Sequence, residues 1–495
     1  MSAIITEKFR QHNASQFVES FTEAAASTYY LFLGKATAYT STTTGGSDSS
    51  PPTPNTGAED EFRAWRSMLG AKLITSSDVK RSIPRRNWSN GATFDMYRHD
   101  YSSSNTTTSG SSDLFDSTFY FMTSDFRVYK VLDNNGGSAF SGSEPTSEST
   151  SPFASGGYVL KYMYTISTSD FSKFGTTDFI PVATDSTVSA AATDGKIESL
   201  VVTSGSGYTD GTYYAAVFGD GTNQGTSSGA IVRITVSSGA IVSFGLTAGT
   251  DTTIHAGGAG YTFGFVNLGD DYIFSDASLS SSASLGSGSG GAIEVIISPD
   301  GGHGSDAVQE LGGHFVMLAT TLTQAEGDDF TTANDFRSVG IVVDPTNFGT
   351  STVATASTRR QTYIVKVDTN SGTFEADERI TQATTGAVGK VVEFDSSLSL
   401  LYYQQEEFKG FGTNATTGGY VAFSGTNQIT GASSGATGTT AGTTETVTLA
   451  NANTVTLTSG YANPELAFPS GNIIYLENRK PIQRASDQTE DIKVI

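Results

Sequence analysis

The sequence predicts a mainly β, multidomain protein built from sandwich-like or barrel-like domains with a few short helices. Glycine supplies 55 of the 495 residues, and together with abundant serine and threonine it disfavours long helices. The 30 phenylalanines and 21 tyrosines supply bulk for folded cores and favour strands. At about 100–200 residues per domain, a chain of this length predicts roughly three domains.

The first 185 residues alternate between regular elements and polar loops. Helical spacing predicts a helix at 6–26, and the apolar run 29–33 predicts a buried strand. A stretch rich in Thr, Ser, Gly and Pro predicts a loop at 40–57, and a short helix follows at 59–69, ending at Gly70. Further strands are predicted at 119–122, 126–132 and 158–166, with a second loop at 134–155.

Charge divides the chain into three parts. Residues 1–185 carry 15 basic and 19 acidic residues, residues 186–459 carry 9 and 26, and residues 460–495 carry 4 and 5. The acidity therefore lies in the middle of the chain. We expect 1–185 and 460–495 to form one core and 186–459 to be an acidic β insertion, with two small domains at about 186–345 and 346–459.

Two pairs of weak repeats lie in this middle part. A Gly-x-Gly-Tyr-Thr sequence occurs at 205–209 and again at 258–262, each after a short predicted strand. A second pair, 374–391 and 423–437, runs from Phe through Ile-Thr to Gly-Ala. Both pairs predict hairpins with glycine-rich turns.

Composition also excludes several classes of protein. The net charge of −22 and the pI near 4.5 argue against binding to duplex nucleic acid or to anionic lipid. The absence of cysteine excludes disulfides, zinc–thiolate sites and iron–sulfur clusters. The sequence has no apolar run of membrane-spanning length and no signal-peptide pattern at its start, so we expect neither membrane insertion nor classical export.

One cluster resembles a metal site. On a helix, Asp306, Glu310 and His314 would share a face and could hold a divalent cation. However, Gly312 and Gly313 should break the helix before His314. The sequence therefore favours a capped turn that supports the following strand, with metal binding as the alternative.

Two known motifs, one catalytic and one dinucleotide-binding, occur in the sequence by residue identity alone, without the sequence context that each requires. Residues 431–435 fit Gly-x-Ser-x-Gly, but no histidine follows that serine as the hydrolase order requires. Residues 286–291 fit a dinucleotide-binding pattern, but a strand is predicted after them instead of a helix. A glycosidase-type carboxylate pair stays open among the many acidic residues. We predict no enzyme activity and no cofactor.

Two segments differ from the surrounding low-complexity sequence. In 81–88, Pro84 holds its neighbour extended, and Arg85 and Arg86 lie beside Trp88, which suits carboxylate pairing, aromatic stacking and interface contacts. An intramolecular arginine–carboxylate clamp is the equal alternative. In 473–495, two predicted strands flank a polar segment, and the last strand must pair with a sheet to avoid aggregation.

These segments resemble the dimeric baseplate wedge protein of T-even-type contractile-tailed phages. The family's Ile-Pro-Arg-Arg-Asx-Trp motif is matched by Ile83 to Trp88. Its C-terminal motifs are matched by Tyr475, Glu477, Asn478, Arg479, Pro481 and Ile482, and then by Asp487, Gln488, Thr489, Glu490 and Ile492. The start, at Thr6, Lys8, Phe9 and Arg10, and the stretch 157–182 are also similar.

The resemblance covers about 1–185 and 460–495, and the middle departs from it like an enlarged insertion of a cyanophage-type relative. It implies a structural virion subunit, a homodimer that contacts other wedge subunits, is assembled in the host cytoplasm and rearranges with the baseplate on infection. Its interface or structural candidates are Arg85, Arg86, Trp88, Tyr475, Glu477, Asn478, Arg479, Pro481, Asp487 and Gln488. The alternative is a glycan-binding tail-fibre or adhesin-type protein.

Overall fold

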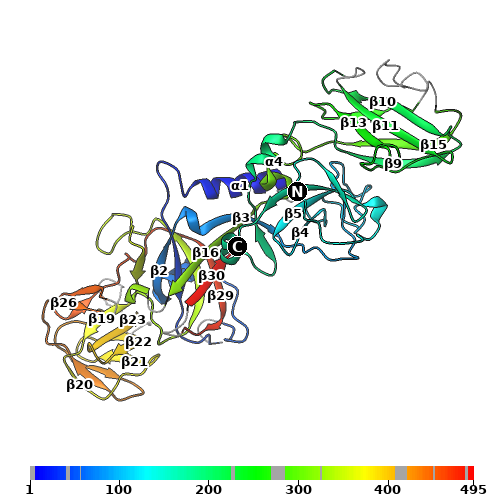
Figure 1. Ribbon diagram of the computed structural model, residues 1–495. Coiled ribbons are helices and arrows are strands. Elements are labelled where there is room, and N and C mark those ends of the chain that lie inside the picture. Colours follow the sequence, from blue (N-terminus) through cyan, green and yellow to red (C-terminus); the bar gives the residue numbers. More distant parts are fainter. Residues whose placement is uncertain are drawn as a thin grey trace. The chain divides into compact units, whose positions relative to one another are not determined.

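The computed structural model describes residues 6–40, 45–55, 57–223, 229–268, 285–323, 326–406, 421–449, 452–484 and 489–495. The chain forms two compact units (Figure 1). The first unit contains 1–17, 80–317 and 495, and the second contains 18–79 and 318–494. Each unit therefore combines segments that are far apart in the sequence.

The described α-helices are few and short: α1 (Glu7–Glu19), α2 (Ala58–Ser67), α3 (Thr168–Phe174), α4 (Ser186–Ala191) and α5 (Ala307–Glu310). The helix predicted at 6–26 ends early, at Glu19. Beyond it, the Ser20 hydroxyl lies 2.7 Å from the Tyr29 hydroxyl and the Phe21 ring stacks on Tyr29 at 4.2 Å. These contacts favour a turn over poor helix-forming residues.

The helix predicted at 59–69 is also shorter, because a strand begins at Met68. That strand is β2 (Met68–Ile74), and it contains Gly70, which we expected to end the helix. A Cβ atom at Gly70 would lie 2.5 Å from the carbonyl oxygen of Asp329. The glycine is therefore needed for close backbone approach inside a sheet.

One sheet of the first unit has the order β4-β5-β7-β6 and carries an aromatic core. Phe119, Phe121, Tyr129 and Tyr164 are all fully buried there. The strands are β4 (Tyr120–Met122), β5 (Arg127–Asp133), β6 (Phe153–Ser155) and β7 (Tyr158–Thr165). β4, β5 and β7 confirm the strands predicted from apolar runs, whereas β6 lies at the end of the expected loop.

The second sheet of the first unit has the order β12-β11-β10-β14-β15-β9, with β13 paired to β11. Its strands are β9 (Ser199–Ser206), β10 (Gly211–Gly219), β11 (Ala230–Ser237), β12 (Ala240–Ile241), β13 (Thr253–Gly257), β14 (Gly264–Val266) and β15 (Ser289–Ile296). The hairpins predicted at the Gly-x-Gly-Tyr-Thr sequences are wrong, because β9 pairs with β15 and β13 with β11. Tyr208 and Tyr261 pack on the core, so each motif joins strands that are not neighbours.

The second unit contains a five-stranded sheet of order β18-β2-β1-β17-β29. Its remaining strands are β1 (Tyr29–Gly34), β17 (Phe336–Val343), β18 (Thr358–Arg360) and β29 (Asn472–Ile482). Every residue of β1 is buried, as expected for a central strand. β29 from the C-terminal segment thus shares a sheet with β1 and β2 from the N-terminal part.

An eight-stranded sheet of order β20-β25-β24-β21-β22-β23-β19-β28 completes the second unit, with a separate β26-β27 hairpin. Its strands are β19 (Tyr363–Lys366), β20 (Thr369–Ser371), β21 (Arg379–Gln382), β22 (Ala387–Asp395), β23 (Leu400–Glu406), β24 (Ile429–Gly431), β25 (Thr437–Thr439) and β28 (Tyr461–Ala462); the hairpin is β26 (Glu445–Thr448) with β27 (Thr454–Leu457). The repeats at 374–391 and 423–437 are confirmed as hairpins, β21-β22 and β24-β25. Thr381 pairs with its equivalent, Thr430, so the two repeats meet antiparallel at the centre.

The remaining strands include two that cross a unit boundary. They are β3 (Val79–Pro84), β8 (Phe179–Pro181), β16 (Phe315–Thr323) and β30 (Thr489–Val494). In the first unit, Ile83 of β3 pairs with Ile180 of β8, and in the second, Leu318 of β16 pairs with Val494 of β30. The described part holds thirty strands against five α-helices, which confirms the mainly β class, while the division at 186–345 and 346–459 stays a prediction.

Candidate functional site

The motif of Ile83 to Trp88 begins in β3, where Ile83 is fully buried. Arg85 donates from Nη1 to the carbonyl oxygen of Thr176 at 2.9 Å, and its guanidinium lies 5.3 Å from the Phe171 ring centre. Arg86 donates from Nη2 to the carbonyl oxygen of Phe115 at 3.0 Å. Both arginines therefore bind backbone carbonyls.

The predicted pairing of one of these arginines with a carboxylate is wrong within the described residues. The Arg86 guanidinium lies 4.5 Å from the ring centre of Tyr120, and its Nη1 is buried with no hydrogen-bond partner. Burial lowers the pKa of Arg86. The aromatic face and the carbonyl take the place that we expected a carboxylate to fill.

This difference sets the expected cost of removing Arg86. Arg86→Met leaves no carboxylate without a partner, so it loses one hydrogen bond and one cation–π contact. We expect the free energy of unfolding to fall by about 1–2 kcal/mol, measured by chemical denaturation. A loss above ~3 kcal/mol would indicate an unidentified charge partner.

Trp88 packs partly buried against the aromatic core and meets Phe140 edge to face at 5.8 Å. Its backbone N–H donates to the carbonyl oxygen of Met122 at 2.8 Å. The indole Nε1 is buried without a hydrogen-bond partner. Trp88 therefore closes the core at the end of the motif.

The C-terminal candidates lie along β29. The Tyr475 hydroxyl donates to Glu477 Oε2 at 2.8 Å, and burial raises the pKa of Tyr475 to about 12. Arg479 Nη1 lies 3.6 Å from Glu477 Oε2, and its side chain is 45% exposed. This row of side chains presents a tyrosine, a carboxylate and a guanidinium in sequence.

The other end of β29 is exposed at Lys480 and Pro481. β29 is the last strand of its sheet, and its pairing with β17 shifts register twice. Proline, lysine and bulges are the features that discourage pairing of an edge strand with another chain. Asp487 and Gln488 lie outside the described residues.

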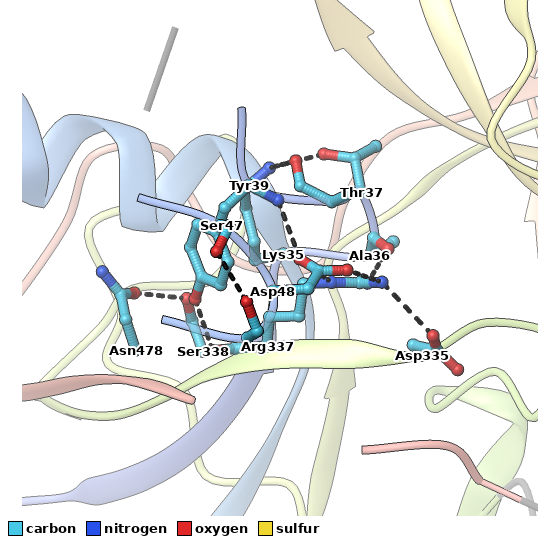
Figure 2. A network of polar contacts seen from close by, with 12 residues as sticks. Lys35, Ala36, Thr37, Tyr39, Ser47, Asp48, Asp335, Arg337, Ser338 and Asn478 are labelled. Carbon is cyan, nitrogen blue, oxygen red and sulfur yellow. Dashed lines mark hydrogen bonds and ion pairs between the residues drawn. The ribbon is translucent and has the colours of Figure 1, made fainter. Parts of the chain in front are cut away.

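A buried arginine network anchors residues 35–40 and 45–52 to β17 and β29 (Figure 2). Arg337, 6% exposed, donates from Nε and Nη2 to the two carboxylate oxygens of Asp48, both at 3.0 Å. Its Nη2 also reaches Asp335 at 3.3 Å, and its Nη1 donates to the carbonyl oxygen of Ala36. The hydrogen bonds from Arg337 hold the pKa of Asp48 below its ordinary value.

The same network includes a candidate from the C-terminal motif. Asn478 accepts from the Ser338 hydroxyl at 2.9 Å and donates from Nδ2 to the carbonyl oxygen of Pro52 at 2.9 Å. The Tyr39 hydroxyl donates to the carbonyl oxygen of Arg337 at 2.7 Å. Asn478 therefore ties a strand of the C-terminal segment to the loop predicted at 40–57.

The Asp306–His314 segment is a capped turn, as expected. Asp306 Oδ1 accepts from the N–H groups of Val308 and Gln309, and α5 ends before Gly312, whose φ is +77°. Glu310 forms a fully buried ion pair with Lys130, and His314 Nδ1 lies 3.0 Å from Glu7 Oε2. Among the residues that the structure describes, no group of three or more His, Cys, Asp or Glu side chains is placed to hold a metal ion.

Close to this turn, His303 is 2% exposed, and both of its ring nitrogens lack a hydrogen-bond partner. Its ring meets Tyr97 edge to face at 5.0 Å. Burial, followed by repulsion from Lys130, Lys161 and Lys196, holds the pKa of His303 well below its ordinary value. His303 is therefore neutral in the folded chain.

This neutral histidine predicts a loss of stability in acid. Below about pH 6.5 the unfolded chain binds a proton at His303 that the folded chain does not, so the free energy of unfolding falls by ~1.4 kcal/mol per pH unit. Wild type and His303→Leu should be compared by denaturation at pH 7.5 and at pH 5. The free energy of unfolding should fall less between pH 7.5 and pH 5 in the variant than in the wild type. An equal fall in both proteins would contradict a neutral buried His303.

The serine of the Gly-x-Ser-x-Gly match, Ser433, lies in a turn that surrounds the buried Glu378. The carboxylate of Glu378 accepts from the backbone N–H groups of Ser433 and Ser434, both at 3.0 Å, and from the Ser434 hydroxyl at 2.7 Å. Burial alone would raise the pKa of Glu378, but these hydrogen bonds together outweigh it, so the pKa is lowered. The residues of this turn serve to hold a carboxylate in the hairpin sheet.

Sequence reasoning missed Arg337 and Lys130. A usable signal was present for Lys130, since Lys130 and Lys161 each stand inside an apolar strand, and a buried lysine requires a carboxylate partner. The nearby Glu310 was noticed only as a possible metal ligand. Arg337 also stands inside a mostly apolar strand, but nothing in the local sequence indicates its partner Asp48, which is 289 residues away.

Comparison with known proteins finds a family in the N-terminal part of the chain. Residues 3–139 match the family model described as Phage-Gp8, bacteriophage T4 Gp8. This is a little over a quarter of the chain, and it includes the Ile83–Trp88 motif but not the C-terminal one. No curated protein matches the chain, and no described helix is long and apolar enough to cross a membrane. The similarity to bacteriophage T4 Gp8 is therefore shown for residues 3–139.

Proposed function

We propose that this chain is a structural subunit of the baseplate wedge that joins neighbouring wedge proteins during tail assembly and rearranges with the baseplate on infection. The match of residues 3–139 to Gp8 carries this proposal. The Gp8 family consists of structural proteins of the baseplate. We therefore propose no enzyme activity, no nucleic-acid partner and no insertion into a membrane for this chain. Assembly would take place in the host cytoplasm.

The subunit is proposed to form a homodimer through 1–185 and 460–495. Residues 186–459 carry 9 basic and 26 acidic residues, and bringing two copies of that region together would cost electrostatic free energy. The ends of the chain are closer to neutral. The middle would then be an enlarged, outward-facing part of a cyanophage-type wedge protein.

The candidate interface residues named from the sequence differ in how far they are exposed. Arg479 and Pro481 are exposed on β29 and are proposed as contact residues, together with the partly exposed Arg85. Arg86, Trp88 and Asn478 make internal contacts and are proposed to support that surface. Tyr475 and Glu477 fix the position of Arg479.

Sedimentation and co-assembly test this function. The purified chain should sediment as a compact dimer of twice 51.8 kDa and form a larger complex with the other baseplate proteins encoded in the same genome. Arg479→Glu should weaken that complex without unfolding the chain. Lys366→Glu is the control, since Lys366 lies outside both proposed segments and its side chain also faces a nearby carboxylate, Glu445.

An elongated trimer that binds glycans and ignores the baseplate proteins would contradict the proposal and favour a fibre or adhesin. If Arg479→Glu and Lys366→Glu affect the complex equally, β29 is not part of the contact surface.

A further inference from the structure

A cavity of about 550 Å³ lies within the first unit, lined both by residues of the segment 1–185 and by residues of the middle of the chain. Its volume falls in the range of sites that bind small molecules or large side chains. Tyr97, Tyr261 and Ser298 line it and are buried, whereas Asp113 and Asp194 line it and are exposed. The cavity thus has a partly aromatic interior and acidic residues near the solvent.

The interior contains a polar group without a partner. Ser298 is 7% exposed, and its Oγ is buried with no hydrogen-bond partner. Tyr97, which also lines the cavity, is 4% exposed. A buried hydroxyl that is left unpaired costs free energy, so the Ser298 hydroxyl is available to a polar ligand.

The charges around the cavity favour a cation. Arg98 is already compensated, because Asp100 and Glu294 each lie 2.7 Å from its Nη2. By contrast, the carboxylates of Asp113 and Asp194 each accept only a backbone N–H, at 2.9 Å. Residues 186–317 carry twelve acidic residues against two basic ones. A negatively charged ligand would be repelled here.

Two exposed phenylalanines follow the cavity lining closely along the chain. Phe263 and Phe265 follow the lining residues Tyr261 and Thr262 along the chain and are 57% and 52% exposed. Phe265 pairs with Phe218 across β14 and β10, with ring centres 6.0 Å apart. Exposed aromatic groups of this kind mark contact surfaces for apolar residues.

We propose that this cavity receives an arginine or lysine side chain from a partner polypeptide, while Phe263 and Phe265 contact apolar residues beside it. Asp113 and Asp194 would pair with the cation, and Ser298 and Tyr97 would meet its polar atoms. The apolar surface favours a polypeptide over a free polyamine. The inference goes beyond the proposed function, which it uses only to place the partner among baseplate proteins.

Calorimetry with the full-length chain and short peptides tests the inference. Acetyl-Leu-Arg-Leu-amide should bind with a dissociation constant in the millimolar range or below, and 0.5 M salt should weaken it because charges are screened. The citrulline peptide has nearly the same shape without the charge, and it should bind about tenfold more weakly. Equal affinities for the two peptides, or no binding of either, would overturn the proposal.

Variants locate the binding. Asp113→Asn with Asp194→Asn keeps the side-chain oxygens that accept from the backbone N–H groups of Phe115 and Gly301 but removes the charges. This double variant should abolish the preference for arginine. Asp116→Asn, an exposed neighbour outside the cavity, should leave it unchanged. Phe263→Ser with Phe265→Ser should weaken the binding of the arginine peptide and of the citrulline peptide by the same factor. If both double variants bind the arginine peptide as tightly as the wild type does, the peptide binds elsewhere. These measurements need no baseplate protein, so their failure is distinct from failure of the wedge assembly.

Discussion

Replacing Glu310 with glutamine is expected to lower the free energy of unfolding by about 3–5 kcal/mol. The carboxylate pairs with Lys130, and the two side chains are 2% and 0% exposed. Glu310 Oε1 also accepts from the N–H of Gly304 at 2.7 Å. Without the carboxylate, Lys130 must either keep an unpaired charge in the core or lose its proton. Burial already lowers the pKa of Lys130, so without its carboxylate partner Lys130 loses its proton at a lower pH than an exposed lysine does.

A double variant separates the pair from its surroundings. Lys130→Met with Glu310→Gln removes both charges, and it should cost clearly less than the sum of the single changes because neither partner is left alone. Lys8→Met is the exposed control, since Lys8 and Asp300 form a pair with both side chains 87% exposed, and it should have no measurable effect. Additive single changes in urea denaturation would show that the two groups are not coupled.

Replacing Arg337 with methionine should destabilise the second unit by about 3 kcal/mol, at the low end for a buried pair because Asp48 is 33% exposed in its side chain. The change removes two hydrogen bonds to Asp48, one to Asp335 and one to the carbonyl of Ala36. The loop at 45–55 should become the most protease-sensitive part of this unit. Limited proteolysis and denaturation together measure the effect.

Arg337→Lys keeps the charge but loses the fork that binds both oxygens of Asp48, so it should recover only part of the stability. Arg479→Ala, on the neighbouring strand, is the exposed comparison and should cost less than ~1 kcal/mol. If the Arg337 and Arg479 variants are equally stable, the network does not anchor the loop.

Local patterns predicted the elements that depend on nearby residues. The apolar runs around Tyr30, Tyr129 and Tyr162 predicted strands because each is buried on both faces. The two Ile-Thr repeats predicted hairpins because their turn glycines, Gly386 and Gly435, adopt φ of +80° and +66°. Such information lies within about ten residues of chain.

Sheet order could not be predicted in the same way. β17 lies between β1 and β29, and nothing in the local sequence of residues 336–343 specifies neighbours some 300 residues before or 140 after. The prediction that Arg85 or Arg86 pairs with a carboxylate was wrong for a related reason. The sequence shows that a guanidinium needs acceptors, but it does not distinguish a carboxylate from a carbonyl and an aromatic ring.

A density map of the intact tail of the phage that encodes this chain tests the central claim most directly. We expect density for both compact units in the baseplate, in two copies per wedge, with the ends of the two chains in contact. Density for the chain only at the tip of a fibre, in threefold arrangement, or its absence from the tail, would contradict a structural role in the wedge.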